Sequence, residues 1–175
     1  METTEKIVEA YVRYVRGWAT IPNLRCAGQK EIDLFAIDPR TDERWHIETS
    51  VSISTSFSKL NNKPFESGEH KVRIKGASAR RKLGFFLEEK FMSPAVTAKL
   101  SEYGCDEAGI RRAIVTWDCT DDVEQAAEAH GIEVWKLPEL MCAVAEQGRK
   151  GNSYFGDDTL RTITLFARGL ATAAP

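Results

Sequence analysis

Apolar and polar residues recur with a helical period at the N-terminus and with a strand period soon afterwards. From Thr3 or Thr4 to about Arg16, apolar side chains recur every three or four positions, which predicts an amphipathic helix that Gly17 ends. After a loop expected around Pro22, residues 31–37 and 44–51 alternate with a period of two, and the intervening DPRTDE is rich in turn formers. This pattern predicts a helix followed by an antiparallel hairpin.

The middle of the chain has a less regular pattern. Residues 52–70 are rich in Ser, Asn and Gly, which predicts a strand end that passes into a long loop. Residues 71–91 predict a basic helix, although its two glycines weaken it. Ser93 followed by Pro94 is typical of a helix start, so we expect a short helix that ends near Gly104.

Strand and helix patterns alternate in the C-terminal part. Strand patterns at 111–117 and 132–137 are each followed by a helical pattern, DDVEQAAEAHG and PELMCAVAEQG. This order implies a parallel strand pair with a right-handed crossover. A Gly-rich linker (148–156) and a last helix (157–171) follow. We therefore expect an α/β domain over residues 1–147, with a central mixed β-sheet flanked by helices, and a segment at 148–175 that docks on it.

The composition is that of an ordinary globular domain and does not by itself indicate a function. At 175 residues the chain is one ordinary domain by length, and its 24 basic and 26 acidic residues give a net charge of −2. Only a local basic run offers a surface for nucleic acid: Lys71, Arg73, Lys75, Arg80, Arg81 and Lys82. The four cysteines are scattered, which favours reduced thiols, and no segment is long and apolar enough for a bilayer. We expect a cytoplasmic protein with no membrane partner.

The predicted hairpin carries the residues of greatest chemical interest. Side chains alternate between the two faces of a strand, so Asp33 on the first strand and Glu48 on the second can be brought together. Two such carboxylates suit one hard cation such as Mg²⁺. Half-exposed strands also carry acidic residues without any function, but Asp33 lies inside the apolar IDLFAI, where a carboxylate costs desolvation unless a cation compensates it. His46 shares the face of Glu48, and a structural histidine is the favoured interpretation.

The order of these motifs resembles the PD-(D/E)xK nuclease superfamily, whose members have the restriction-endonuclease-like fold. The matching elements are TEKIVEAYVRYVRGW, KEIDLFAID, HIETS and HGIEVWKLPEL, over roughly residues 4–140. The resemblance implies that Asp33 and Glu48 bind Mg²⁺ or Mn²⁺, with the main-chain carbonyl of Thr49 as a further ligand. It also implies a catalytic Glu on the first helix, for which we prefer Glu5 because it borders the apolar stripe, while Glu9 points further into solvent.

One position departs from the pattern of this superfamily. Ser50 stands where the motif has a lysine, and serine has neither a positive charge nor the basicity to replace it. Losing one preorganised catalytic group costs about 10²- to 10³-fold in rate. A lysine from elsewhere can take over this role, and the candidates that follow the motif are Lys59, Lys71 and Lys75.

Three functions remain open from the sequence. The leading hypothesis is a metal-dependent endonuclease that hydrolyses DNA phosphodiester bonds with Asp33, Glu48 and Glu5 at its site. A homodimer is expected only because nucleases that cut duplex DNA often need two sites. The second hypothesis is a catalytically inactive module of the same fold that binds DNA or a protein partner, which Ser50 motivates. The third is a structural or partner-binding protein unrelated to nucleic acid, which the acidic net charge favours.

Overall fold

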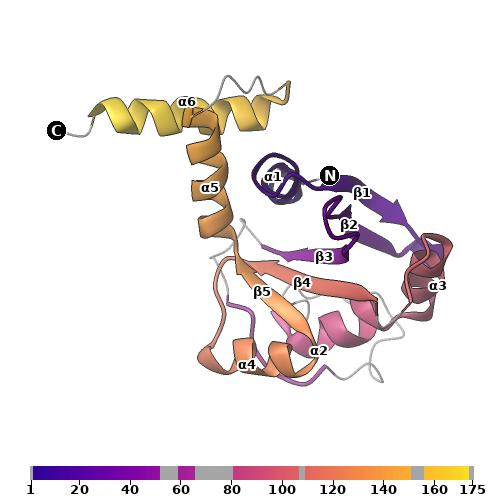
Figure 1. Cartoon of the computed structure of the whole chain (residues 1–175). Helices are drawn as coiled ribbons and strands as arrows, with labels where there is room; N and C mark the ends of the chain where they lie inside the picture. The colour runs from indigo at the N-terminus through magenta and orange to yellow at the C-terminus, as the bar shows by residue number, and fades with distance from the viewer. Residues whose placement is uncertain (1, 52–58, 66–80, 107–108, 151–155, 174–175) are drawn as a thin grey trace.

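A five-stranded mixed sheet forms the centre of the computed structural model, which describes residues 2–51, 59–65, 81–106, 109–150 and 156–173 (Figure 1). The strands lie in the sheet in the order of the chain, from β1 to β5. Their bounds are Ala19–Arg25 (β1), Glu31–Ile37 (β2), Arg44–Ser50 (β3), Ile110–Thr116 (β4) and Ile132–Lys136 (β5). The strands β1, β2 and β3 pair antiparallel, whereas β3, β4 and β5 pair parallel. The predicted α/β class with a mixed sheet is therefore confirmed.

The predicted hairpin is formed by β2 and β3. Its turn is closed by Asp38, whose carboxylate accepts a hydrogen bond from the backbone N–H of Arg40 at 3.0 Å. Leu34 pairs with Ile47 across the hairpin. Because the strands are antiparallel, this register brings the start of β2 to the same edge of the sheet as the end of β3.

Helices cover both faces of the sheet (Figure 1). On one face lie α1 (Thr3–Ala10), its π-helical continuation η1 (Tyr11–Val15) and α5 (Leu137–Lys150). On the other lie α2 (Leu83–Phe85), the π-helical η5 (Phe86–Phe91) and α4 (Asp121–Ala129), with α3 (Pro94–Glu102) at the β1 and β2 side. A short 3-10 turn, η2 (Ala27–Gln29), joins β1 to β2.

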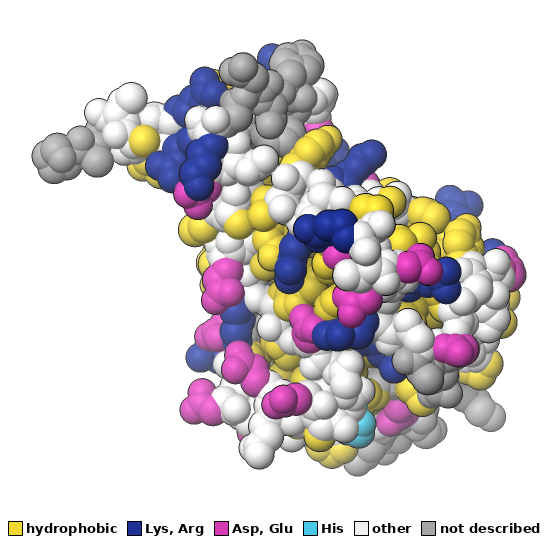
Figure 2. All heavy atoms as spheres, in the orientation of Figure 1, with side chains coloured by type: hydrophobic (Ala, Val, Ile, Leu, Met, Phe, Trp, Pro, Cys, Tyr) yellow, Lys and Arg dark blue, Asp and Glu magenta, His cyan; other side chains and the backbone are white. Residues whose placement is uncertain are grey.

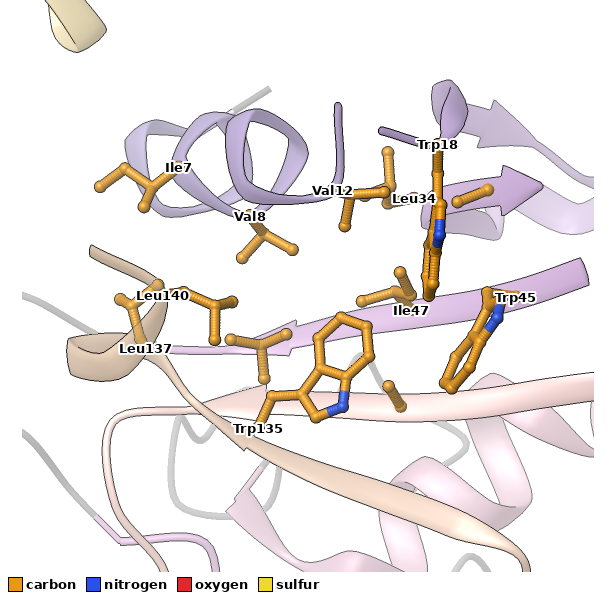
Figure 3. Packing of buried hydrophobic residues seen from close by; sticks show 13 residues of the cluster. Ile7, Val8, Val12, Trp18, Leu34, Trp45, Ile47, Trp135, Leu137 and Leu140 are labelled. Carbon is orange, nitrogen blue, oxygen red and sulfur yellow. The ribbon is translucent and has the colours of Figure 1, made fainter. Parts of the chain in front are cut away.

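The core under α1 and α5 is rich in tryptophan. Figure 3 shows the apolar side chains of α1 directed toward Leu34 and Ile47 of the sheet. Beside them, Trp18 stacks on Trp45 with ring centroids 5.1 Å apart, and Trp135 packs against both. Burial of such large apolar surfaces fixes the helix on the sheet and so sets the position of the hairpin.

One prediction for the first half of the chain needs correction, and another is confirmed for most of the part that the structure describes. The segment around Pro22 was expected to be a loop, but it forms the edge strand β1, where proline is tolerated because one side of the strand needs no ladder hydrogen bond. The basic helix expected at 71–91 is helical at Leu83–Phe91, where the chain is described. Most of its basic run lies outside the described residues.

The last helix, α6 (Asp158–Ala173), lies across the end of α5 (Figure 1). Asp157 caps its N-terminus, because it accepts hydrogen bonds from the backbone N–H groups of Thr159 and Leu160 at 2.9 and 3.3 Å. Leu160 is buried against α1 and α5, and basic side chains gather near this junction in Figure 2. None of the described helices is long and apolar enough to cross a membrane.

Candidate active site

Asp33 and Glu48 face each other at the α2 and η5 side of the sheet. Asp33 lies near the start of β2 and Glu48 near the end of β3, one position beyond the pair of Leu34 with Ile47. The backbone N–H of Asp33 lies 3.4 Å from Oε1 of Glu48, so the two residues are direct neighbours. Both are buried: Asp33 is 8% exposed and Glu48 is 0% exposed. The sheet alone therefore brings together the two carboxylates that the sequence singled out.

A lysine from a distant part of the chain completes the cluster. Lys90 lies in η5, and its Nζ atom is 3.1 Å from Oδ1 of Asp33 and 2.5 Å from Oε2 of Glu48. The apolar residues Phe86 and Phe91 of the same helix are buried, and they hold this helix against the sheet. The Lys90 side chain therefore passes from a packed helix to a point between the two carboxylates, with 24% of its surface exposed.

His46 supports the carboxylate of Glu48 from the opposite side. It is fully buried on β3, and its Nε2 atom lies 2.7 Å from Oε1 of Glu48. The edge of the imidazole packs on Phe91, with ring centroids 4.7 Å apart. Nδ1 of His46 is buried and has no hydrogen-bond partner within the described chain. Since a neutral imidazole carries one proton, Nε2 must be the protonated nitrogen that donates to Glu48.

Burial dominates the electrostatics of this cluster. It raises the pKa of Asp33 to about 6, helped by the charge of Glu48 and opposed by Lys90. Burial likewise raises the pKa of Glu48, and the Lys90 ammonium opposes the rise. Burial alone would lower the pKa of Lys90, but the two carboxylates outweigh it and raise that pKa. Burial and the nearby Lys90 charge lower the pKa of His46 to about 3, so the imidazole is neutral near pH 7.

These charges leave room for one more cation. With Lys90 protonated and His46 neutral, two ionised carboxylates give the cluster a surplus of one negative charge. Each carboxylate oxygen also has more than one acceptor position, so the present partners do not exhaust them. In the described part of the chain no group of three or more His, Cys, Asp or Glu side chains is placed to hold a metal. Two carboxylates suit Mg²⁺, which keeps several water ligands of its own.

Glu5, the preferred helix carboxylate, lies at the β1 side of this site. Its Oε2 atom accepts a hydrogen bond from the backbone N–H of Glu2 at 2.9 Å, which caps α1. Asn23 of β1 donates to the same oxygen at 3.5 Å, and the register of β1 and β2 places Asn23 opposite Asp33. A role for Glu5 beside the carboxylate pair stays a prediction, because α1 and the helix with Lys90 pack on opposite faces of the sheet. Glu9 instead accepts hydrogen bonds from Arg13 and Thr20.

Thr49 and Ser50 complete the end of β3. The backbone N–H of Thr49 donates to Oδ2 of Asp33 at 2.8 Å, which fixes the orientation of that carboxylate. The proposed role of the Thr49 carbonyl as a ligand stays a prediction. Ser50 is half-buried and pairs with Thr116 of β4.

Of the three lysines suggested as substitutes, only Lys59 lies within the described residues, and it is placed elsewhere. Lys59 forms an ion pair with Asp118 at 2.8 Å, away from the carboxylate pair. Lys71 and Lys75 lie outside the described residues. The missed residue is Lys90, and the sequence held a signal for it. At about 100° per residue, Lys90 falls in the middle of the apolar stripe of Leu83, Phe86, Leu87 and Phe91, where a solvated lysine would not be expected.

Comparison with known proteins finds a distant structural likeness but no match in sequence. No protein-family model matches the chain, and no curated protein matches it in sequence. A crystal structure of a repair endonuclease from Pyrococcus abyssi superposes with a TM-score of 0.41 and 14% sequence identity. The superposition covers 78% of this chain and 47% of that protein, so the chain spans about half of its length. The functional proposal below rests on the residues of the site.

Proposed function

We propose that the chain is a metal-dependent endonuclease with a restriction-endonuclease-like fold, which hydrolyses phosphodiester bonds in DNA. The observation that carries this proposal is the position of Lys90, whose ammonium contacts both carboxylates of the hairpin. On β3, Ser50 occupies the position where a lysine was expected. Lys90 supplies an equivalent positive charge from η5, which packs on the sheet. The same observation disfavours the inactive module, because the absence of a lysine was its main motivation.

The strand order supports the finer description of the fold. An antiparallel hairpin with both carboxylates, followed by a parallel strand and a crossover helix, is the arrangement that the motif order led us to expect. The first helix covers one face of this sheet, and the helix with Lys90 covers the other. The two carboxylates and the lysine thus come from three separate elements that meet at one edge.

Each residue has a distinct role in the proposed reaction. Asp33 and Glu48 would hold one Mg²⁺ or Mn²⁺ ion, which when bound would make a water molecule more acidic and offset charge on the phosphate. Lys90 orients the attacking water and stabilises the negative charge that develops on the phosphoryl oxygens. The N–H of Thr49 and the imidazole of His46 hold the two carboxylates in fixed orientations.

Cleavage and metal binding by single variants test this proposal. Purified protein is incubated with supercoiled, single-stranded and branched DNA in Mg²⁺ or Mn²⁺, and Mn²⁺ binding is measured by calorimetry. Asp33→Asn and Glu48→Gln preserve shape but remove a ligand charge. We expect each to lose Mn²⁺ binding and to cleave at least about 10²-fold more slowly. Cleavage by Asp33→Asn at the wild-type rate would contradict the assignment.

A matched control separates the site from a general loss of charge. Lys30 also contacts the η5 helix, where its ammonium lies 2.9 Å from Oε2 of Glu89, but it lies outside the carboxylate cluster. Glu89→Gln therefore removes a carboxylate next to Lys90 in sequence, 32% exposed and outside the cluster, and it should cleave DNA at the wild-type rate. Tight, Glu48-dependent Mn²⁺ binding with no cleavage of any DNA would instead favour the inactive module.

A further inference from the structure

A second cluster of lysine, cysteine and carboxylates lies at the ends of β4 and β5. Lys136 ends β5, Cys119 follows β4, and Glu124 lies in the first turn of α4. The register aligns Lys136 with Thr116 on β4 and, through it, with Ser50 on β3. Two strand spacings, about 10 Å, therefore separate this cluster from the strand that carries the active-site carboxylate. Acidic side chains gather around α4 on the face shown in Figure 2.

The amine of Lys136 and the sulfur of Cys119 lie unusually close to each other. Their Nζ and Sγ atoms are 2.5 Å apart. A hydrogen bond between nitrogen and oxygen is usually about 2.9 Å long, and one to the larger sulfur atom is longer still. The observed separation is too short for an ordinary hydrogen bond and matches two atoms that are joined through one bridging atom.

The surroundings of this pair suit a covalent reaction between the two side chains. Oε1 of Glu124 is 2.8 Å from the Lys136 amine and 3.5 Å from the Cys119 sulfur, so one carboxylate contacts both groups and holds them side by side. Glu124 is 60% exposed and the Lys136 side chain is 22% exposed, so small oxidants reach the amine from solvent, whereas Cys119 is 6% exposed and is expected to react slowly. Cys26 and Cys105, by contrast, each donate a hydrogen bond to a backbone carbonyl.

We propose that Cys119 and Lys136 form an oxidative modification site, at which a peroxide inserts one oxygen atom between Sγ and Nζ. The Lys136 ammonium first loses one proton to solvent. One thiol, one amine and two molecules of hydrogen peroxide then give one S–O–N bridge and three molecules of water. The S–H bond, one N–H bond and both O–O bonds break, and the S–O and O–N bonds form. Sulfur and nitrogen each lose two electrons, which the peroxide molecules take up.

The bridge would connect elements that the reduced protein holds together only by weaker contacts. Cys119 belongs to a turn that pairs with Leu60, because the N–H of Leu60 donates to Asp118 and the N–H of Thr120 donates to Leu60. A covalent link to Lys136 therefore fastens the end of β5 to the turn after β4, with which Leu60 pairs. Such a cross-link restricts the unfolded chain, so the oxidised protein should melt about 5 °C higher than the reduced protein.

Mass spectrometry of the full chain tests the modification directly. The protein is reduced with dithiothreitol, exchanged into buffer and treated with millimolar hydrogen peroxide, because burial raises the pKa of the Cys119 thiol and slows its oxidation. The expected product is a cross-linked pair of peptides that contain Cys119 and Lys136, about 14 Da heavier than their sum, since one oxygen is gained and two hydrogens are lost. Dithiothreitol should reverse it.

Matched variants make the result specific to this pair. Cys119→Ser and Lys136→Arg should abolish the cross-link and the rise in melting temperature, whereas Cys26→Ser and Lys59→Arg should retain both. Mapping of the wild-type peptides does not depend on whether any variant folds. Oxidation that adds only one or two oxygens to Cys119, a cross-link that is lighter by two hydrogens, or a product that persists in Lys136→Arg would overturn the proposal. The experiment needs no nuclease activity.

Discussion

Two clusters in this protein contain the same groups, a lysine between two carboxylates, but in different surroundings. The lysines are almost equally exposed, at 24% for Lys90 and 22% for Lys136. The carboxylates differ: the side chains of Asp33 and Glu48 are 10% and 0% exposed, whereas those of Asp118 and Glu124 are 42% and 60% exposed.

The difference in burial reverses the direction of the pKa shifts. In the buried cluster the loss of solvent raises the pKa of both carboxyl groups despite the adjacent ammonium. In the exposed cluster hydrogen bonds from lysines lower the pKa of Asp118 and Glu124. Perturbed acids in a buried pair are a feature of functional sites, while exposed ion pairs are common and contribute little. The comparison therefore favours the first cluster as the site of the proposed phosphodiester chemistry.

Removing the central lysine should lower stability by very different amounts in the two clusters, and the loss in the buried cluster should be the largest effect. Lys90→Met leaves two buried carboxylates without a cation, and we expect it to lower the free energy of unfolding by about 3–5 kcal/mol. Lys136→Met removes a surface ion pair, which should cost at most about 1 kcal/mol. Urea unfolding of the reduced proteins at pH 7 measures both. Equal losses would show that burial does not distinguish the two clusters.

Neutralising one carboxylate in each cluster should change stability in opposite directions. Because burial raises the pKa of Asp33, its neutral form is favoured, and Asp33→Asn should unfold at the same or higher urea concentration than the wild type at pH 7. Asp118→Asn loses its hydrogen bond from Lys59 and should be slightly less stable. Only the first variant should lose DNA cleavage. A marked loss of stability in Asp33→Asn would contradict the raised pKa.

The pH dependence of stability should follow from the same shift. The pKa of Asp33 rises from 3.8 to about 6 on folding, so between these values the folded protein binds more protons than the unfolded chain. Stability from this group therefore falls as pH rises from about 4 to 6, by at most about 3 kcal/mol. Unfolding of the wild type and of Asp33→Asn across this range isolates the contribution. Cleavage should in turn decline as pH falls through about 6, because a protonated Asp33 cannot bind the cation.

Changes at His46 should have a smaller effect that is confined to the active site. His46→Phe keeps an aromatic ring against Phe91 but loses the donor to Glu48. We expect Mn²⁺ affinity to fall about 10- to 100-fold, as for other groups that orient a metal ligand. His46→Gln can still donate a hydrogen bond and should recover part of this loss. If both variants bind Mn²⁺ as the wild type does, His46 serves only the packing of the core.

The hairpin was the part of the site that the sequence could predict. Alternation of side chains along two adjacent strands is a local property, so Asp33 and Glu48 could be paired from their spacing alone. A structural role was the favoured interpretation of His46. The residue is fully buried, and it also contacts Glu48 of the candidate site. The edge strand β1 was missed because Pro22 obscured its pattern.

The position of Lys90 depends on tertiary packing, which local patterns do not contain. The residue lies 57 positions after Asp33, and only the docking of η5 on the sheet brings the two together. The substitute lysines suggested by the sequence, Lys59, Lys71 and Lys75, all lie closer to the motif than Lys90 does. A lysine within an apolar helical stripe is a better signal than proximity in sequence, because its burial must be compensated by a nearby acid.

Moving the lysine from η5 to position 50 of β3 is the sharpest test of the catalytic role proposed for Lys90. The rate of Mn²⁺-dependent DNA cleavage is measured for the wild type, Lys90→Met and the double variant Lys90→Met with Ser50→Lys, with circular dichroism to confirm folding. The site predicts that Lys90→Met cleaves about 10²- to 10³-fold more slowly. It also predicts that a lysine at position 50, on the strand face of Glu48, restores part of this loss. Cleavage by folded Lys90→Met at the wild-type rate would contradict the account.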